Sequence, residues 1–312
     1  MPLSRETIIQ KAKELDLDLA GFASAKSLED KLPQKYRPSR IAGHMRTLII
    51  VAKRSYTGFV FAHHSGTKQF WGGRIIKRLD ETCAKLADFV ESLGASAFPV
   101  SSLMIDMKGD GLDLCPAGQG SPLLKMAAVE AGLGTLGLNN MLLTPEFGPR
   151  IYLGGVLTDA EIEPGKPLKE ELCLGLEACG RCAAVCPEDA IPRRARRGAR
   201  LSEYRGLDQA ACARSSQPLG ARRFKEHLTE IFLTRDRPEE MWSRLGSRLT
   251  GAFWQEMIMV KEGVFTGCSA CVNVCPVGED YRQLAEKQKI AAPEVQKTTT
   301  ADEVEVERLA RP

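Results

Sequence analysis

The sequence predicts a layered domain of the α/β or α+β class, followed by a cysteine-rich module. An apolar run of strand length, TLIIVAKR, occupies 47–54, and a long helical pattern follows over 68–93. ASAFPVSS at 95–102 has the composition of a strand, which completes a strand–helix–strand unit. Two cysteine runs with a common spacing then follow, at 173–187 and 267–276.

Shorter elements are predicted on either side of this unit. Ser4 would cap a helix over 4–15, and DLAGFAS at 18–24 follows as a short strand. SPLLKMAAVEA at 121–131 has helical spacing, and RIYLGGVLTD at 150–159 is a predicted strand. Together these segments extend the layered domain over the N-terminal half of the chain.

The chain is expected to divide into three parts. Residues 1–167 would form the layered domain, and residues 168–285 would form the cysteine module. An insertion at 213–266 interrupts the module, and its central part, 238–260, has helical spacing. The tail, 286–312, is polar and lacks a core pattern, so we expect it to be mobile or docked on a partner.

Composition sets limits on the class of protein. With 312 residues, 43% hydrophobic and 27% charged, the chain is an ordinary globular sequence that needs no cysteine staples. A net charge of +3 is too mild to indicate nucleic acid. The N-terminus, MPLSRETIIQ, has no signal-like apolar region or twin arginine, and no apolar run approaches the ~20 residues of a membrane helix. We therefore expect a cytoplasmic protein without a membrane or nucleic-acid partner, in which clustered cysteines indicate metal or redox chemistry.

Eight of the ten cysteines form two sets with the spacing of iron–sulfur ligands. The first run has the spacing C-x5-C-x2-C-x3-C-P, and the second has C-x2-C-x3-C-P with one further cysteine far upstream. Both runs resemble the duplicated bacterial ferredoxin motif, in which the last cysteine of each run binds the cluster of the other run. This crossing assigns a first cluster to Cys173, Cys179, Cys182 and Cys275, and a second cluster to Cys186, Cys212, Cys268 and Cys271.

Two [4Fe-4S] clusters are favoured over two structural zinc sites. A C-x2-C turn points two thiolates at one cluster, and the helix begun by the x3 step carries the last thiolate toward the neighbouring cluster. Zinc also accepts four cysteines but does not require the x3-C-P extension, which occurs here twice. The long spacers after Cys173 and Cys212 do not forbid ligation, because the entropy of loop closure grows slowly with length.

Three single residues outside these sets carry their own expectations. Cys83 lies on the apolar face of the helix predicted over 68–93, so we expect it in the core. Cys115 lies in a loop rich in Gly, Asp and Pro, where a cysteine can serve as a functional thiol. Trp71 is expected in the core, with an aromatic wall for a flat cofactor as the alternative.

The segment AGLGTLGLNN at 131–140 contains the spacing G-x-G-x-x-G. In a dinucleotide site this motif follows a strand and opens a helix, whereas here it follows a helix and leads into a strand. We therefore do not expect a nicotinamide cofactor. One glycine would end the helix, and three in six residues indicate that the backbone comes close to something large and flat, or to another strand.

The segment from Ala131 to Asp159, followed by the double cysteine motif, resembles the corrinoid-dependent iron–sulfur reductases. This group contains the reductive dehalogenases, which have a segment similar to 144–150, TPEFGPR. It also contains the epoxyqueuosine reductases, which have a segment similar to 131–139, AGLGTLGLN. The resemblance covers roughly residues 40–285 and includes one second-set cysteine far upstream of its partners.

The resemblance implies an α+β fold, in which a nitroreductase-like domain binds cobalamin beside a bacterial-ferredoxin-like module with two [4Fe-4S] clusters. Cobalamin would lie base-off, and electrons would pass through the clusters to the cobalt. The chain has four histidines and lacks the D-x-H-x-x-G cobalamin motif, in agreement with this arrangement. The matched loop would lie along the corrin, which assigns cofactor contacts to Gly132, Gly134, Gly137, Leu138, Asn139 and Asn140.

The proton donor is not assigned by the resemblance. Where epoxyqueuosine reductases carry an acidic motif, this chain has Gln119, which cannot donate a proton as an acid, so epoxyqueuosine reduction is not expected. Tyr56 lies close to Lys53 and Arg54 at a strand end, so it is a candidate catalytic acid with a lowered pKa, against the alternative of a solvated strand end. Three further candidate acids lie on a polar loop: Asp106, Asp110 and Asp113.

Two functions are compatible with these features. The first is a cytoplasmic iron–sulfur reductase, resembling the reductive dehalogenases, that reduces a small organic substrate through two clusters and cobalamin. The second is an electron-transfer or reactivating protein that reduces the corrinoid of a partner protein and has no substrate of its own. The basic run at 193–205 is a dock for an acidic partner or a solvated linker. Either function requires a low-potential electron donor such as ferredoxin or flavodoxin.

Overall fold

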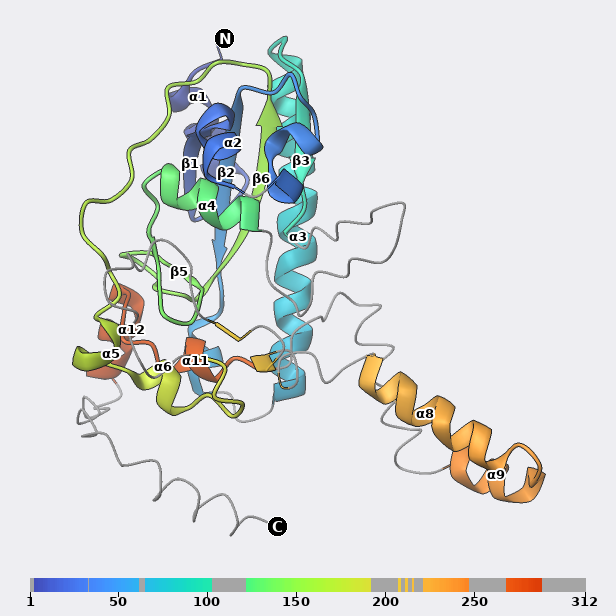
Figure 1. Ribbon diagram of the computed structural model, residues 1–312. Helices are drawn as coiled ribbons and strands as arrows, with labels where there is room; N and C mark the ends of the chain where they lie inside the picture. The colour runs from blue at the N-terminus through green and yellow to red at the C-terminus, as the bar shows by residue number, and fades with distance from the viewer. Residues whose placement is uncertain are drawn as a thin grey trace.

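A four-stranded antiparallel sheet with the strand order β1-β2-β6-β3 forms the centre of the computed structural model (Figure 1). Its strands are β1 (Leu19–Ser24), β2 (Thr47–Arg54), β3 (Ala97–Val100) and β6 (Ile151–Thr158). The structure describes residues 3–32, 34–61, 65–102, 122–191, 207–208, 211–212, 215, 221–246 and 268–287.

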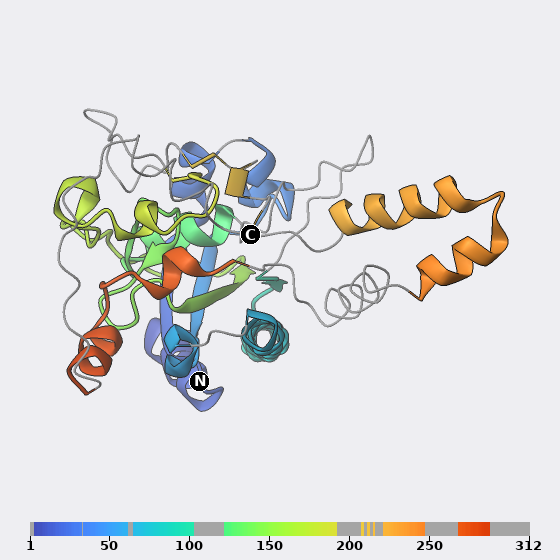
Figure 2. The same cartoon turned by 90° about the horizontal axis from the view of Figure 1, so that it is seen from below.

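Helices cover both faces of this sheet, so the fold is a layered, mixed α/β arrangement (Figures 1 and 2). One apolar core joins the sheet to α2 and α4, and a second core joins its other face to α1 and α3. These helices are α1 (Arg5–Glu14), α2 (Ala25–Lys31), α3 (Ser65–Ser92) and α4 (Pro122–Glu130), and short 3-10 turns lie at η1 (Gln34–Tyr36), η2 (Pro38–Arg40) and η3 (Thr57–Phe61).

Strand β2 is buried on both faces, which explains why its sequence is a continuous apolar run rather than an alternating one. Successive side chains of a strand point to opposite faces of the sheet. Accordingly, Leu48 and Ile50 enter the core with α2 and α4, whereas Ile49 and Val51 enter the core with α1 and α3. All four are fully buried.

The predicted elements of this domain are confirmed, with bounds that differ by a few residues. The backbone N–H of Thr7 donates to Ser4 Oγ at 3.3 Å, which is the N-cap expected for α1. Cys83 is 1% exposed and lies in the core, as predicted. The prediction that Trp71 is a core residue is wrong, because its side chain is 40% exposed.

Short helices carry the rest of the described chain. Figure 1 shows α5, α6, α11 and α12 together at one end of the sheet, and α8 and α9 extending away from it. The helix expected within 238–260 begins as predicted with α9, whereas α8 was not predicted, and residues 247–267 lie outside the described residues. The bounds are α5 (Gly175–Ala178), α6 (Arg181–Ala184), α8 (Ala221–Thr234), α9 (Pro238–Leu245), α11 (Ala270–Asn273) and α12 (Glu279–Lys287), with a two-stranded pair β4 (Thr135–Leu136) and β5 (Leu142–Leu143).

Several predicted features lie outside the described residues: Cys115, Gln119, the three candidate acids of the polar loop, the basic run at 193–205 and the tail from 288 onward. Within the part of the chain that the structure describes, no helix has the length and apolarity needed to cross a membrane.

Candidate functional site

Seven of the eight clustered cysteines lie on or within two residues of three four-residue helices, α5, α6 and α11, which Figure 1 shows at one end of the sheet. Helices α6 and α11 contact each other, which brings the two cysteine runs side by side. All eight are half-buried, and none of them is in a disulfide bond. Such thiols are accessible enough to bind a cofactor and close enough to act on one another.

Four of these thiols act on one another as a first group. Burial raises the pKa of Cys182 to about 12. The negative charges of four other cysteines contribute to this rise: Cys271, Cys173, Cys275 and Cys179. Burial also raises the pKa of Cys275 to about 11, again with contributions from Cys173 and Cys179. The first group therefore takes three cysteines from one run and one from the other, and Cys271 links it to the second group.

The other four thiols form a second group around Cys271. Burial raises the pKa of Cys271 to about 12, followed by the negative charges of Cys268, Cys212 and Cys186. Within the described residues, no three Cys, His, Asp or Glu side chains lie close enough together to bind a single metal ion. Charges act on one another over longer distances than a coordination bond spans. The thiols can therefore influence one another's pKa without being close enough to bind one metal ion.

The upstream Cys212 reaches the second group through a short capped turn. The N–H of Asp208 donates to the carbonyl of Ala190 at 2.8 Å, which ties this turn to the chain just after Cys186. The Asp208 carboxylate then accepts from the N–H of Ala211 at 2.9 Å, and the N–H of Cys212 donates to the carbonyl of Asp208 at 2.9 Å. A carboxylate in this position is an ordinary helix N-cap, so the 55-residue gap that separates Cys212 from the second run in the sequence is bridged by local contacts near the first run.

A buried arginine joins the sheet domain to the end of the second run. Arg150 is 3% exposed, and its guanidinium donates twice to the Asp280 carboxylate, at 2.8 and 2.6 Å. It also donates to the carbonyls of Cys275 at 3.0 Å and Val277 at 2.6 Å, and it lies 5.3 Å from the centre of the Tyr281 ring. The positive charge of Arg150 lowers the pKa of Cys275, against the larger effect of burial.

Two glycines allow this close contact. Gly148 has a φ of +51°, and a Cβ added there would collide with the carbonyl oxygen of Val277. Gly278 has a φ of +114°, and a Cβ there would meet the backbone nitrogen of Gly148 at 2.5 Å. Only glycine tolerates both the backbone conformation and the lack of space. The segment 144–150 is therefore a docking loop for the chain that follows Cys275.

The glycine segment at 131–140 also makes its close contacts with protein. A Cβ at Gly132 would collide with the carbonyl oxygen of Lys166, and one at Gly134 would collide with that of Leu143. A Cβ at Gly137 would meet the side-chain oxygen of Asn139 at 2.8 Å. Of the two explanations open from the sequence, close approach to another segment of chain therefore accounts for all three glycines.

Polar side chains of the sheet domain also reach the backbone beside the cysteines. Thr135 is 3% exposed, and its hydroxyl accepts from the N–H of Leu172 at 3.0 Å, one residue before Cys173. The amide of Asn139, 6% exposed, donates to the carbonyl of Cys271 at 3.5 Å. Because a buried polar group left without a partner is costly, these contacts fix where the cysteine helices sit.

Lys68, near the start of α3, makes a further tie of this kind. Its ammonium donates to the side-chain oxygen of Asn273 at the end of α11. Burial lowers the pKa of Lys68 to about 8, against the negative charges of Cys268 and Cys271, which raise it. Lys68 thus brings a cation to the second group, as Arg150 does to the first.

A narrow cavity lies against the first group. Part of the glycine segment forms one wall, so three of the residues expected to contact a corrin lie beside these cysteines, whereas Gly132, Gly134 and Asn140 do not line it. Its lining also includes Leu143, Leu174, Gly175, Gly180, Arg181, Pro276 and Val277, together with Gly137, Leu138, Asn139, Cys173, Cys179, Cys182 and Cys275.

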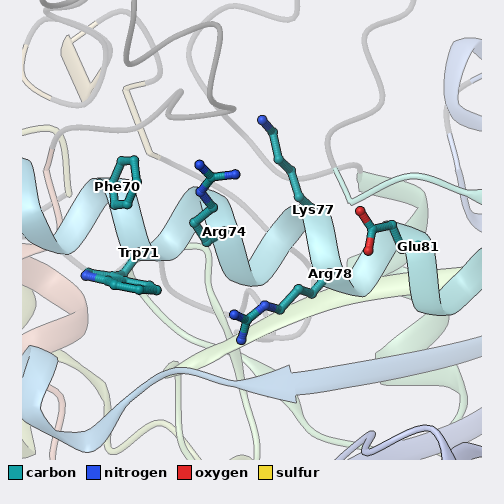
Figure 3. Close-up of a pocket in the computed structure, with 6 residues that line it drawn as sticks. All are labelled: Phe70, Trp71, Arg74, Lys77, Arg78 and Glu81. Carbon is teal, nitrogen blue, oxygen red and sulfur yellow. The ribbon is translucent and has the colours of Figure 1, made fainter.

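A second, open cavity of about 420 Å³ lies along α3 (Figure 3). All of its described lining residues come from that one helix, with Phe70, Arg74 and Lys77 on one side of it and Trp71 and Arg78 on the other. The volume is in the range of small-molecule sites, and the lining combines aromatic with cationic side chains. Such a lining suits a planar or anionic ligand.

Tyr56 lies at the end of β2 within an aromatic cluster. Its ring makes edge contacts with Phe59, at 5.4 Å between centroids, and with Trp71, at 6.5 Å, and the residue is 48% exposed. The expected basic partners of Tyr56 are engaged elsewhere. Lys53 pairs with Asp16 at 3.0 Å and Asp18 at 3.3 Å, and Arg54 pairs with Asp18 at 3.7 Å, so the strand end presents both cations to acidic residues.

Known proteins with similar sequences are reductases. The chain is 28% identical over 208 residues to a tetrachloroethene reductive dehalogenase of Desulfitobacterium hafniense, a match covering 65% of this chain and 28% of the dehalogenase. It is 34% identical over 122 residues to that of Dehalobacter restrictus, covering 38% and 18%. It is 24% identical over 309 residues to the epoxyqueuosine reductase of Bacillus subtilis, covering 89% and 64%. No protein-family model matches the chain.

Two solved structures are similar in part. A structure of epoxyqueuosine reductase from Bacillus subtilis has a TM-score of 0.43 at 20% identity and covers 60% of this chain and 52% of its own. A reductive dehalogenase structure, described as suggesting a mechanism for B12-dependent dehalogenation, has a TM-score of 0.43 at 20% identity and covers 60% and 25%.

By sequence, the chain is similar to reductive dehalogenases and to epoxyqueuosine reductases, which are oxidoreductases. It spans less than a third of the dehalogenase relatives and about two thirds of the epoxyqueuosine reductase from Bacillus subtilis.

Proposed function

We propose that the chain is an iron–sulfur reductase that holds two [4Fe-4S] clusters and passes electrons from them to a base-off cobalamin, with a small organic molecule as substrate. One observation carries this proposal: α6 and α11 contact each other and thiols of the two cysteine runs act on one another, which supports two groups of four. Each group takes three cysteines from one run or its upstream outlier and one from the other run, as in two-cluster ferredoxins. The proposed ligands are Cys173, Cys179, Cys182 and Cys275 for the first cluster, and Cys186, Cys212, Cys268 and Cys271 for the second.

The chemistry of the donor set fits clusters. Iron–sulfur clusters take thiolate ligands, and the eight cysteines are half-buried, outside disulfide bonds and mutually coupled. The N–H of Ala190 donates to the sulfur of Cys186 at 3.3 Å. Gly180, with a φ of +60°, and the buried Ala183 keep bulk away from the thiols of the first run. We propose a ferredoxin-like role for this part and a nitroreductase-like role for the sheet domain.

The proposed cobalamin site lies beside the first group, along part of the glycine segment. Leu138 and Asn139 line the cavity beside Cys182, so they and Gly137 are the proposed corrin contacts, whereas Gly132 and Gly134 serve the protein's own close contacts. When bound, cobalamin would supply a cobalt centre that accepts electrons singly and reduces a carbon–heteroatom bond. The chain's part is to hold the cofactor dry, admit the substrate and deliver a proton.

Tyr56 is the proposed proton donor of the sheet domain. It lies on the solvent side of the aromatic cluster with Trp71, whose side chain lines the α3 cavity. Because Lys53 and Arg54 pair with Asp16 and Asp18, the phenol would have to act without those cations beside it. The cavity's cations, Arg74, Lys77 and Arg78, would attract an anionic substrate.

The test is anaerobic purification followed by iron quantitation and EPR, before and after cobalamin is added. The proposal predicts about eight irons per chain and a base-off cobalt spectrum. Cobalamin that stays base-on in a protein with eight irons would remove the cofactor from the proposal. Absence of iron after reconstitution would remove the clusters as well.

The second candidate is an electron-transfer protein that reduces the corrinoid of a partner. It is favoured by α8 and α9, which extend from the body and carry exposed apolar side chains at Phe232, Leu233 and Trp242. An assay with halogenated organic compounds, cobalamin and a chemical reductant separates the two functions. Turnover of the halogenated compound without a partner protein supports the reductase. Reduction of a corrinoid protein without such turnover supports the second candidate.

A further inference from the structure

The first turns of α3 bring a charge from the sheet domain to the cysteine helices. Lys68 donates its hydrogen bond to Asn273, the last residue of α11. Asn273 lies two residues after Cys271 and two before Cys275, so the ammonium is held at the helix that joins the two groups. The side chain of Lys68 is half-buried, which strengthens any charge interaction it makes.

The charge of Lys68 acts on members of the second cysteine group. The charged groups that act on it are Cys268 and Cys271, both members of the second group. Among the described residues, no carboxylate acts on Lys68, and its hydrogen-bond acceptor is the neutral amide oxygen of Asn273. The charge of Lys68 therefore acts on the sulfur ligands proposed for the second cluster.

The corresponding cation at the first group is neutralised. Arg150 donates to the backbone carbonyl of Cys275, but two of its hydrogen bonds go to the Asp280 carboxylate at 2.8 and 2.6 Å. An ion pair with this geometry presents little net charge to its surroundings. The sheet domain thus gives each group one cation, compensated at the first group and uncompensated at the second.

We propose that Lys68 sets the reduction potential of the second cluster, acting as a positioning residue through charge. Reduction of a [4Fe-4S] cluster adds one negative charge, and a fixed cation nearby stabilises the reduced state. Lys68 therefore makes the second cluster easier to reduce than it would be without this charge. The inference rests on the proposed function, because it presupposes a cluster on Cys186, Cys212, Cys268 and Cys271.

The test is an EPR-monitored redox titration of the cluster-loaded full chain and its variants. Lys68→Gln removes the charge and keeps a donor for Asn273, whereas Lys68→Arg keeps both charge and donor. The expected result is a lower midpoint potential for one cluster in Lys68→Gln and no change in Lys68→Arg. Asp280→Asn marks the other cluster, because it leaves Arg150 uncompensated and should raise the potential of the first cluster alone.

Each outcome decides the inference. Unchanged potentials in a Lys68→Gln protein that binds about eight irons overturn it and leave the proposed function standing. A wild-type protein that binds no iron after reconstitution overturns both. If Lys68→Gln fails to fold, Lys68→Met carries the same test without the hydrogen bond, and a midpoint shift confined to the cluster that Asp280→Asn does not move supports the role of Lys68.

Discussion

Arg150 shows at the scale of one residue why a motif can be found in a sequence before its purpose is known. The string TPEFGPR marked a resemblance, but nothing in it pointed to Asp280 far along the chain. The structure joins the two through a buried, doubly hydrogen-bonded ion pair, with Asp280 at 14% side-chain exposure. Such a pair costs much to break, because the remaining partner keeps its charge out of water.

We predict that Arg150→Met lowers the free energy of unfolding by about 3–5 kcal/mol, the range for removing one partner of a buried ion pair. Denaturant unfolding of the apo-protein measures this change. Arg282→Met is the matched control, since Arg282 is 67% exposed and pairs with Glu279 on the same helix. Its loss should change the free energy by less than about 1 kcal/mol. Equal losses in the two variants would contradict the role given to Arg150.

Cys83 gives a second prediction at this scale. Burial, followed by the negative charge of Asp80, raises the pKa of Cys83 to about 12 from 9.0. Alkylation requires the thiolate, so at pH 8 the thiol should react about a thousandfold more slowly in the folded protein than in the unfolded chain. Peptide mapping after timed iodoacetamide treatment measures the two rates. A raised folded pKa stabilises the protein fully below pH 9, and this contribution is lost as the pH rises toward 12.

At the scale of elements, the docking loop depends on glycine. Gly148→Ala would place a Cβ on the carbonyl of Val277 at a φ of +51°. We predict a loss of at least ~1–3 kcal/mol in the free energy of unfolding, from strain and displacement of α12. Gly58→Ala is the matched control, because a Cβ there meets nothing within 4 Å. Thermal unfolding of the two proteins in parallel gives the comparison, and similar midpoints would argue against a docking loop.

The elements that the sequence predicts well are those with long periodic patterns. β2 and α3 are recognisable because an apolar run or an amphipathic face records burial directly. The four-residue helices α5, α6 and α11 have no period to detect, and only cysteine spacing revealed that region. α8 was not predicted, although it is amphipathic. The helical spacing recognised in the insertion began at Pro238, where α9 begins.

The candidate site was predictable only as a list of ligands. The spacing within each run, together with the crossed ligand pattern of two-cluster ferredoxins, predicted which cysteines belong together. The residues that hold them in place, such as Lys68, Asn139 and Arg150, carry no signal of their own. Their partners are more than a hundred residues away in the sequence, so only the folded chain brings them together. The sequence also offered Lys53 and Arg54 as cations beside Tyr56, but it gave no sign that they pair with Asp16 and Asp18.

At the scale of the whole molecule, the second cluster depends on the distant Cys212. We predict that Cys212→Ala reduces the iron content from about eight to about four per chain, because the ligands of the first cluster stay intact. Iron quantitation and EPR after anaerobic reconstitution measure the loss. Cys83→Ala should retain about eight irons, since Cys83 is in the core of the sheet domain. A Cys212→Ala protein with full iron would remove this residue from the ligand set.

Metal removal should affect the two ends of the molecule differently. The sheet domain has two apolar cores of its own, whereas α5, α6 and α11 span one turn each. Helices that short are not stable by themselves. Chelation should therefore speed amide exchange at α5, α6 and α11 and leave the strands protected, as hydrogen-exchange mass spectrometry can measure. Equal exchange with and without iron would show that the protein holds these helices without the metal.

The ties that Thr135, Asn139, Lys68 and Arg150 make to the cysteine helices also bear on how portable this module is. A ferredoxin-like segment is normally a candidate for expression by itself as a small electron carrier. If residues from 168 onward were removed from the sheet domain, all four contacts would be lost. The buried side chains of Asn139 and Arg150 would then be exposed. Transfer of this module to another protein would therefore require the part of the sheet domain that makes these contacts.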